Sequence, residues 1–288
     1  MRVLLTGASG QLGCELRPRL AAAGFALAAP EPEELDLARP GEIDSFWRQN
    51  RPQLVINAAA YNQVDVAERE PQAAFLVNAL AVRHLAVACR QWDIRLVHYS
   101  TDYVFDGRTD RPYTEEDPTH PLGAYAVSKL AGELYAQAYL EAPLIIRTSG
   151  VFGPGGRHTA RGNFIELMLR LAGEHRPIRV VEDHIASPTY APALAARTAD
   201  LVERGASGIF HLGGGTAISW FDYAAMIFRL AGIPAKLQPT NEREYRTAAR
   251  RPKYSALSNQ KAEAFGIAPM PPLEEAVRRY LEEREKNI

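Results

Sequence analysis

The sequence predicts an α/β protein in which helices cover a parallel sheet and a smaller lobe follows. Short apolar runs alternate with helix-length segments through the first half of the 288 residues, as expected of a parallel sheet. A glycine-rich turn follows the first run directly, and the pattern changes after residue 150. We therefore predict a Rossmann-type doubly wound parallel sheet, a dinucleotide-binding domain, at 1–150. Residues 151–288 would mainly form a smaller C-terminal α/β substrate lobe, with chain crossings back into the first domain.

The first predicted strand, 2–6, runs into a glycine turn at 7–13 and then into a helix. Gly7 permits the tight turn, Gly10 lets the backbone approach a pyrophosphate, and Gly13 lets the helix pack close to the strand. Free N–H groups and the dipole at the helix start favour an anion there. An ordinary glycine-rich turn is the alternative, but its place between strand and helix favours a dinucleotide site.

The second predicted strand, 25–29, ends before an acidic stretch at 30–34. In dinucleotide folds an acidic residue here is typical of NAD and a basic one of NADP. Glu31 could accept a hydrogen bond from a ribose hydroxyl, although a solvated acidic loop is an equal alternative. We predict that NADH is accepted, with at most a modest preference for NADPH.

A helix at 41–50, a third strand at 54–56 and a long helix at 64–90 complete the first half of the sheet. Small residues at 57–60 leave room for a ligand beyond the third strand, although helix packing also favours alanine. Asn78, on the apolar face of the long helix, is predicted to be a hydrogen-bonding anchor for a neighbouring strand.

The fourth predicted strand, 94–99, ends at Ser100 and Thr101. Their hydroxyl groups could hydrogen-bond a substrate oxygen, and a turn cap is the alternative. The polar loop at 108–121 has no periodicity and is interpreted as a surface excursion near the mouth of the site.

Tyr125 and Lys129 open a helix that is predicted to run to about residue 142. The spacing i, i+4 places both side chains on one face. A nearby ammonium group lowers the pKa of a tyrosine by ~1–3 units, which makes the phenol a usable acid near neutral pH. A chance pair is common at this spacing, but its place after a hydroxyl-bearing strand and a dinucleotide turn favours catalysis.

The remaining elements include a fifth strand at 144–149 and a turn at 153–156. The further helices are predicted at 163–172, 187–203, 219–231 and 273–286, the further strands at 178–181 and 208–212, and a loop at 251–255.

Composition argues against several classes of protein. A formal net charge of −1 gives no electrostatic basis for binding nucleic acid or an anionic membrane. The 2 cysteines fit a reducing cytoplasm better than a disulfide framework. We expect no signal peptide, no membrane-spanning run and, because the 7 histidines are scattered, no metal site.

Together these motifs resemble the extended short-chain dehydrogenase/reductase superfamily and, within it, the dTDP-4-dehydrorhamnose reductases. The resemblance covers nearly the whole chain, and the spacing Gly-x-x-Gly-x-x-Gly is its first mark. Its further marks are 57–60, 64–68, 100–107, 147–149, 163–164, 188–189, 219–220 and 251–252.

The resemblance implies NADH- or NADPH-dependent reduction of the C4 ketone of dTDP-4-dehydro-6-deoxy-L-mannose to dTDP-L-rhamnose. Tyr125 would give the proton, Lys129 would hold the cofactor ribose and keep Tyr125 acidic, and Thr101 would hydrogen-bond the reacting oxygen. The implied cofactor-binding residues are Gly7, Gly10, Gln11, Leu12, Gly13, Asp36, Leu37, Ala60, Tyr61, Asn62, Ser100, Tyr125 and Lys129. The implied substrate-binding residues are Thr101, Asp102, Gly150, Asn163 and Arg251, the last because its fork suits a diphosphate.

Two departures concern the site. The family usually has Trp at the position of Gly150, against the sugar, and Thr at the position of Asn62. We expect the space at Gly150 to remain partly open, although Tyr61, Phe152 or Phe164 could refill it. Some family members dimerise through a metal held by glutamates; Glu15 matches one such position but Pro192 occupies another, so no metal is predicted and a homodimer stays possible.

Two other functions remain open. One is a related nucleotide-sugar reductase or epimerase acting on another sugar. The other is a non-catalytic, cofactor-binding regulatory subunit, against which the intact set of Thr101, Tyr125 and Lys129 argues.

Overall fold

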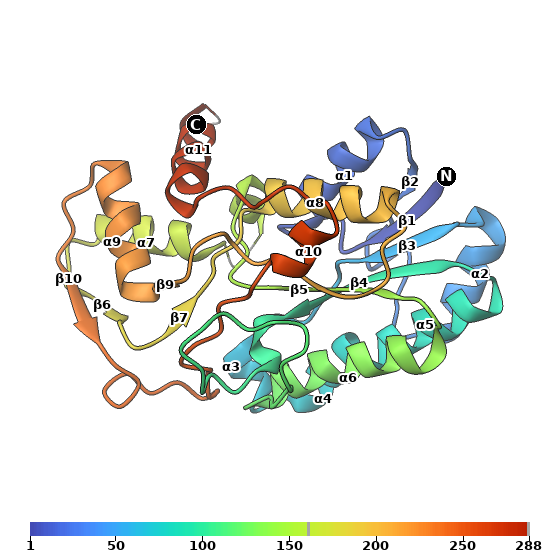
Figure 1. Cartoon of the computed structure of the whole chain (residues 1–288), viewed down its shortest axis with the longest axis horizontal. Coiled ribbons are helices and arrows are strands. Elements are labelled where there is room, and N and C mark those ends of the chain that lie inside the picture. Colours follow the sequence, from blue (N-terminus) through green and yellow to red (C-terminus); the bar gives the residue numbers. More distant parts are fainter. Residues whose placement is uncertain (160–161, 287–288) are drawn as a thin grey trace.

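A six-stranded parallel sheet runs through the computed structural model, which describes residues 1–159 and 162–286 (Figure 1). The strand order is β2-β1-β3-β4-β5-β8. The order reverses beside β1, which leaves a crevice at the carboxyl ends of β1 and β3. The strands are β1 (Arg2–Thr6), β2 (Ala26–Ala28), β3 (Leu54–Asn57), β4 (Arg95–Thr101), β5 (Leu144–Thr148) and β8 (Gly208–His211).

Helices cover both faces of this sheet. In Figure 1, α1 (Gly13–Ala22) and α8 (Ala191–Glu203) lie above it, and α5 (Ala81–Gln91) and α6 (Ala124–Tyr139) lie below. Side chains alternate between the faces along each strand. Leu5 therefore packs with the helices of the upper face and Leu4 with those of the lower face, where α2 (Pro40–Asn50) also packs. Both layers are buried, as the doubly wound fold requires.

The long helix predicted at 64–90 is divided in the structure. It consists of α3 (Val64–Ala67), α4 (Pro71–Phe75), a π-helical turn (Leu76–Leu80) and α5. Pro71 begins a new helix, because proline is favoured in the first turn and lacks the N–H that a continuing helix would need. By length and apolar composition residues 71–91 could cross a membrane, but 50% of the apolar window is buried inside the fold.

The C-terminal lobe has a core of its own. It is formed by α7 (Phe164–Gly173), α9 (Trp220–Ala231) and α11 (Leu273–Lys286), with Phe152 and Tyr280 at its centre. Two small sheets edge it, one pairing β6 (Ile178–Val181) with β10 (Leu237–Thr240) and the other pairing β7 (Ile185–Ala186) with β9 (Ile218–Ser219). Four short elements were not predicted, because they are too short to show a periodic pattern: β7, β9, β10 and α10 (Gln260–Ala264).

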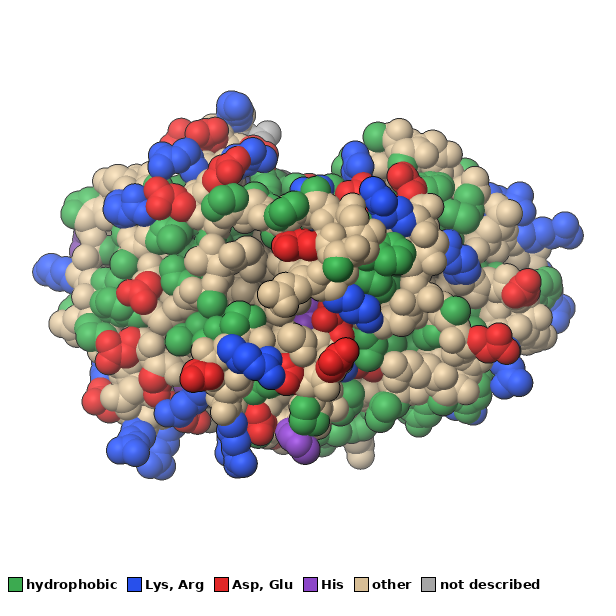
Figure 2. All heavy atoms as spheres, in the orientation of Figure 1, with side chains coloured by type: hydrophobic (Ala, Val, Ile, Leu, Met, Phe, Trp, Pro, Cys, Tyr) green, Lys and Arg blue, Asp and Glu red, His purple; other side chains and the backbone are tan. Residues whose placement is uncertain are grey.

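The chain crosses back into the first domain after residue 190. Helix α8 packs against α1 and β8 extends the parallel sheet, so Leu194 and Phe210 belong to the same core as the first strand. The predicted fold, a doubly wound parallel sheet with a smaller C-terminal lobe, is confirmed. The domain boundary near residue 150 stays a prediction. On the face in Figure 2, acidic and basic side chains are interspersed over both lobes.

Candidate active site

The glycine turn after β1 has the geometry of a phosphate-binding turn. Gly7 has φ +68°, and a Cβ on it would lie 2.5 Å from the backbone nitrogen of Ala59. A Cβ on Gly13 would lie 2.1 Å from the carbonyl oxygen of Gly7, so neither position accepts a side chain. Helix α1 begins here without a side-chain cap; the N–H groups of Cys14 and Glu15 donate to the carbonyls of Gly10 and Leu12 at 2.9 and 3.0 Å, and the positive end of the helix dipole faces the turn.

Three buried polar atoms at the carboxyl end of the sheet have no hydrogen-bond partner among the described residues: Gln11 Oε1, the Tyr61 hydroxyl and Ser100 Oγ. They come from the segments that follow β1 and β3 and from the end of β4. A buried polar atom left without a partner costs ~1–3 kcal/mol, so a polar ligand is expected to meet them. The pyrophosphate, ribose and amide groups of a nicotinamide dinucleotide fit this cradle.

Asn78 fixes the segment that carries Tyr61. Its Oδ1 accepts from the backbone N–H of Tyr61 at 2.8 Å, and its Nδ2 donates to the carbonyl of Tyr61 at 3.0 Å. Nδ2 also donates to Ser128 Oγ on α6 at 3.0 Å. Asn78 is thus a hydrogen-bonding anchor as predicted, but its partners are the segment after β3 and helix α6 rather than a strand. Its place in the π-helical turn is typical of a functional position.

The segment after β2 carries acidic and basic groups. Ser9 Oγ donates to Glu31 Oε2 at 2.8 Å, which holds this carboxylate beside the glycine turn. Asp36 accepts from the backbone N–H of Ala38 at 2.9 Å and lies 3.2 Å from the guanidinium of Arg39. Arg39 is the nearest basic side chain downstream of the acidic stretch and was not among the predicted cofactor-binding residues. Its exposed guanidinium is also paired with Glu42, 3.0 Å from Oε1.

Helix α6 carries the predicted Tyr–Lys pair. The carboxylate of Glu68 accepts from the backbone N–H of Ala124 at 2.7 Å and thereby fixes the start of the helix. Lys129 is buried, and its Nζ donates to the carbonyl oxygen of Tyr99 on β4 at 2.5 Å. The ring of Tyr125 meets that of Tyr103 edge to face, with centroids 6.2 Å apart. The pair therefore lies beside the carboxyl end of β4.

Burial lowers the pKa of Lys129 to about 8, and the charge of Glu133, one turn along α6, opposes this shift. Glu133 is itself buried and paired with Arg147 of β5, with Oε2 and Nη2 2.7 Å apart. The guanidinium of Arg147 also lies over the ring of Phe105, 5.2 Å from its centroid. Glu133 was not among the predicted site residues, although an acid four residues after Lys129 on a helix was the signal that could have found it.

Thr101 caps the short turn that follows β4. Its Oγ1 accepts a hydrogen bond from the backbone N–H of Tyr103 at 3.2 Å and donates one to Asp102 Oδ1 at 3.1 Å. Asp102 was predicted to bind substrate, but it is only 3% exposed. Its Oδ2 accepts from Ser149 Oγ at 2.8 Å and from Ser255 Oγ at 2.6 Å. The Asp102 carboxylate thus joins three hydroxyl groups, and its contact with substrate stays a prediction.

Gly150 lies just beyond β5 with φ +49°, a conformation that other residues rarely adopt. Its Cβ position would be 3.4 Å from Cα of Pro188 and 3.4 Å from the indole of Trp220. The aromatic residue at this position is thus Trp220, which the sequence analysis did not consider. Phe152 is buried in the C-terminal core, and Phe164 packs against Trp220 with centroids 4.7 Å apart.

Two predicted substrate residues have structural partners. Asn163 caps α7 through a bond from the N–H of Glu166 at 3.1 Å, and its Nδ2 donates to the Tyr280 hydroxyl at 3.1 Å. The guanidinium of Arg251 forms a bidentate ion pair with Asp65, with Nη2 2.7 Å from Oδ2 and Nη1 3.1 Å from Oδ1. A diphosphate would have to compete with Asp65 for this fork.

The segment after β5 lies against the glycine turn. Gln11 Nε2 donates to the carbonyl of Val151, and the N–H of Gly155 donates to Glu15 Oε1 at 3.3 Å. Glu15, which matches a metal position of the family, thus accepts from the backbone of this segment. Among the side chains that the structure describes, no three of His, Cys, Asp or Glu converge as a metal site requires.

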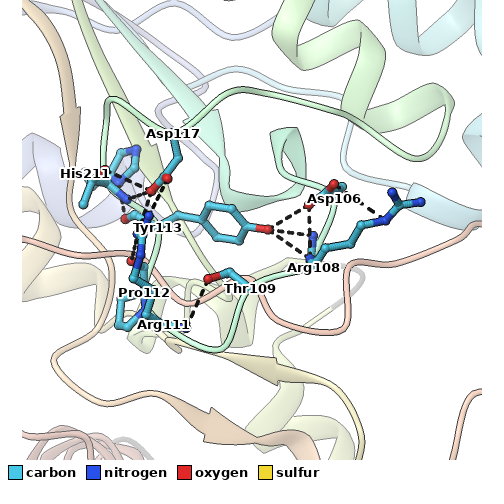
Figure 3. A network of polar contacts seen from close by, with 10 residues as sticks. Asp106, Arg108, Thr109, Arg111, Pro112, Tyr113, Asp117 and His211 are labelled. Atoms are coloured by element: carbon cyan, nitrogen blue, oxygen red, sulfur yellow. Dashed lines mark hydrogen bonds and ion pairs between the residues drawn. The ribbon is translucent and has the colours of Figure 1, made fainter.

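The loop at 106–121 is tied down by polar contacts (Figure 3). The Tyr113 hydroxyl donates to Asp106 Oδ1 at 2.9 Å and accepts from the N–H of Gly107 at 2.9 Å. Asp117 pairs with Arg111 at 2.7 Å, and His211 Nδ1 lies 3.0 Å from the carbonyl of Tyr113. The loop is therefore a fixed part of the fold, joined to the end of β8.

Comparison with known proteins agrees with this geometry. The family model described as "RmlD substrate binding domain" matches residues 1–286. The dTDP-4-dehydrorhamnose reductase of Escherichia coli is 38% identical, with 98% of each chain covered. A crystal structure of a dTDP-4-dehydrorhamnose reductase from Clostridium acetobutylicum has a TM-score of 0.94 at 32% identity, with 99% of this chain and 100% of that chain covered. That of the Bacillus anthracis reductase in complex with NADP has a TM-score of 0.92 at 34% identity and covers 98% of this chain and 99% of its own. The chain therefore belongs to the RmlD substrate-binding domain family, in which its similar relatives are dTDP-4-dehydrorhamnose reductases.

Proposed function

We propose that the chain is an NAD(P)H-dependent oxidoreductase that reduces the C4 ketone of dTDP-4-dehydro-6-deoxy-L-mannose to dTDP-L-rhamnose. The observation that carries this proposal is the place of Tyr125 and Lys129 on α6, beside the end of β4 and the cradle after β1. The names of the full-length relatives support the substrate, and the NADP complex of one of them supports the cofactor.

The cofactor, when bound, supplies the hydride for the substrate carbon. The turn at Gly7, Gly10 and Gly13 with Gln11 and Leu12 would hold its pyrophosphate, and the unpartnered hydroxyls of Tyr61 and Ser100 would meet its polar groups. Asp36 and Leu37 would border the adenine, and Ala60 and Asn62 would border the remainder. The carboxylate of Glu31 favours NADH, whereas Arg39 gives NADPH a cationic partner.

Tyr125 would donate the proton that the forming alkoxide requires. Lys129, held at the carbonyl of Tyr99, would keep a positive charge close to the phenol and thereby stabilise its ionised form after the transfer. Thr101 would hydrogen-bond the reacting oxygen and stabilise its developing charge. Trp220 would replace the tryptophan that relatives have at the position of Gly150 as the apolar wall for the sugar.

Another sugar nucleotide is the second candidate, because Gly150 and Trp220 alter the wall of the proposed sugar pocket. A regulatory subunit without catalysis is a weaker candidate, since Thr101, Tyr125 and Lys129 are all in place. A cytoplasmic location, a homodimer and the absence of membrane or nucleic-acid partners stay predictions.

The test is cofactor oxidation followed at about 340 nm, an absorbance of the reduced nicotinamide. dTDP-4-dehydrorhamnose would be compared with other 4-keto sugar nucleotides, with NADH and NADPH in turn. We expect the highest kcat/KM for dTDP-4-dehydrorhamnose. A higher kcat/KM for another sugar would favour the second candidate, and no turnover of any of them would favour the regulatory one.

A further inference from the structure

Asp102 is a buried carboxylate that accepts from three hydroxyl groups on three separate segments. Thr101 donates to Oδ1 at 3.1 Å, while Ser149 and Ser255 donate to Oδ2 at 2.8 and 2.6 Å. Thr101 belongs to the proposed catalytic set. Its hydroxyl has a single proton, and in this arrangement that proton points at Asp102.

This geometry conflicts with the task assigned to Thr101. A hydroxyl that stabilises a forming alkoxide must donate its proton to that oxygen. While Asp102 is ionised, it competes with the substrate for the same proton. Hydrogen bonds to a charged acceptor are the stronger ones, so the carboxylate is a strong competitor.

We propose that Asp102 is a positioning residue whose own proton decides whether the Thr101 hydroxyl can donate into the site. The proposal rests on the proposed function for the identity of the reacting oxygen. When Oδ1 takes up a proton, this new O–H donates to Thr101 Oγ1. The proton of Thr101 is then released to the substrate oxygen, while Ser149 and Ser255 still donate to Oδ2 and the N–H of Tyr103 still donates to Oγ1.

The surroundings of Asp102 allow its carboxyl group to titrate near neutral pH. Burial raises the pKa of Asp102 to about 6, against the lowering effect of Ser255, Ser149 and Thr101. Tyr103, on the same turn, feels its charge, and burial raises the pKa of that phenol to about 12. Tyr103 therefore stays neutral while Asp102 titrates.

The charged groups on the neighbouring segments are engaged with one another. Arg251 pairs with Asp65 at 2.7 Å, and Lys253 pairs with Asp183 at 3.3 Å. His184, next to β7, lies 3.2 Å from the same Asp183. Tyr254 neighbours Ser255 in the chain, and burial raises the pKa of its phenol. These pairs leave the three hydroxyl groups and the backbone N–H of Asp102 itself as the direct partners of the carboxylate.

The first test is the pH dependence of kcat in wild type and in Asp102→Asn. In wild type, kcat should fall as pH rises through about 6. The fall should be roughly tenfold to hundredfold, because the transition state then loses one hydrogen bond to a charged oxygen. In the variant the amide oxygen suits the two donors at Oδ2 and the NH₂ group suits Thr101, so the variant mimics protonated Asp102. This fall should be absent, leaving only the loss near 8 that belongs to Lys129. An unchanged fall near 6 in the variant would overturn the proposal.

Ser255→Ala keeps the proposal testable if Asp102→Asn does not fold. Loss of one donor to the carboxylate should move the midpoint upward by about one unit. Ser258→Ala, on the same segment but bonded to the N–H of Gln260, is the matched control and should leave the midpoint in place. A midpoint that is equal in the two variants would contradict the proposal.

A measurement without turnover separates this inference from the proposed function. Infrared spectra of wild type minus Asp102→Asn, recorded over pH, follow the protonated carboxyl of Asp102. Thr101→Val removes one donor and should shift the titration upward by about one unit. An unchanged titration midpoint of Asp102 in Thr101→Val would contradict the inference. Absence of turnover of dTDP-4-dehydrorhamnose by wild type would contradict the proposed function alone.

Discussion

At the residue scale, Tyr125 and Lys129 have different tasks, and variants should separate them. Tyr125→Phe should lower kcat by ~10²–10⁴ with little change in NADH affinity, because it removes only the proton donor. Lys129→Met should lower both kcat and NADH affinity, because Lys129 also contacts the cofactor ribose in the proposal.

In wild type the buried Lys129 has a pKa of about 8, below its usual value, so its charge is present below pH 8 and is lost above it. Activity should therefore decline through pH 8. Stopped-flow kinetics and fluorescence titration of NADH test these points, and a Tyr125→Phe enzyme with the parental kcat would contradict the assignment.

Gly150 is the residue at which the structure changes the expected outcome. Its φ of +49° strains any side chain, and the indole of Trp220 already lies 3.4 Å from the Cβ position. Gly150→Ala should lower the free energy of unfolding by ~1–3 kcal/mol through backbone strain. Gly150→Trp should lose activity as well, because its ring would clash with Trp220 and Pro188. Denaturant unfolding and steady-state kinetics measure both effects. A lower KM in Gly150→Trp than in wild type would instead show that the pocket is still open.

At the element scale, the pair of Glu133 and Arg147 joins α6 to β5 under the proposed catalytic residues. Glu133→Gln would leave the buried Arg147 without its counter-charge, at a cost of about 3 kcal/mol in unfolding free energy. It would also remove the charge that raises the pKa of Lys129, so the alkaline loss of activity should begin below pH 8. Glu282→Gln, exposed on α11, is the matched control. An unchanged pH profile in Glu133→Gln would mean that Glu133 acts on stability alone.

The elements also show what local sequence can predict. The glycine turn and the Tyr125/Lys129 pair were predictable because each is a contiguous pattern with a fixed geometry. The partners of Asp102 were not, because Ser149 and Ser255 lie 47 and 153 positions away in the chain. Trp220 was missed for the same reason, since it meets Gly150 only once the C-terminal lobe has folded. The break at 68–70 and the short strands escaped prediction because they carry no periodic signal.

At the scale of the whole molecule, one contact fastens the loop after β10 to the first domain. Asp65, on α3, accepts from the backbone N–H of Ala249 at 3.0 Å and from both Nη atoms of Arg251. Its carboxylate therefore fixes the backbone and the side chain of the same loop. This loop leads directly to Ser255 and hence to Asp102, so the contact couples the approach of the C-terminal segment to the proposed site.

Two variants distinguish this latch from the diphosphate contact that the sequence analysis predicted for Arg251. If Arg251 serves as a latch, Asp65→Asn and Arg251→Met should act alike: each should raise KM and speed hydrogen exchange at Ala249. The effect should be about 1 kcal/mol, because both side chains are partly exposed to water. If Arg251 instead binds the diphosphate, Asp65→Asn should free its guanidinium and lower KM, whereas Arg251→Met should raise it. Arg251→Lys keeps the positive charge but loses the two parallel N–H donors of the guanidinium. It should therefore weaken the contact in either case, whether the partner is Asp65 or a diphosphate. Opposite shifts of KM in Asp65→Asn and Arg251→Met would reject the latch.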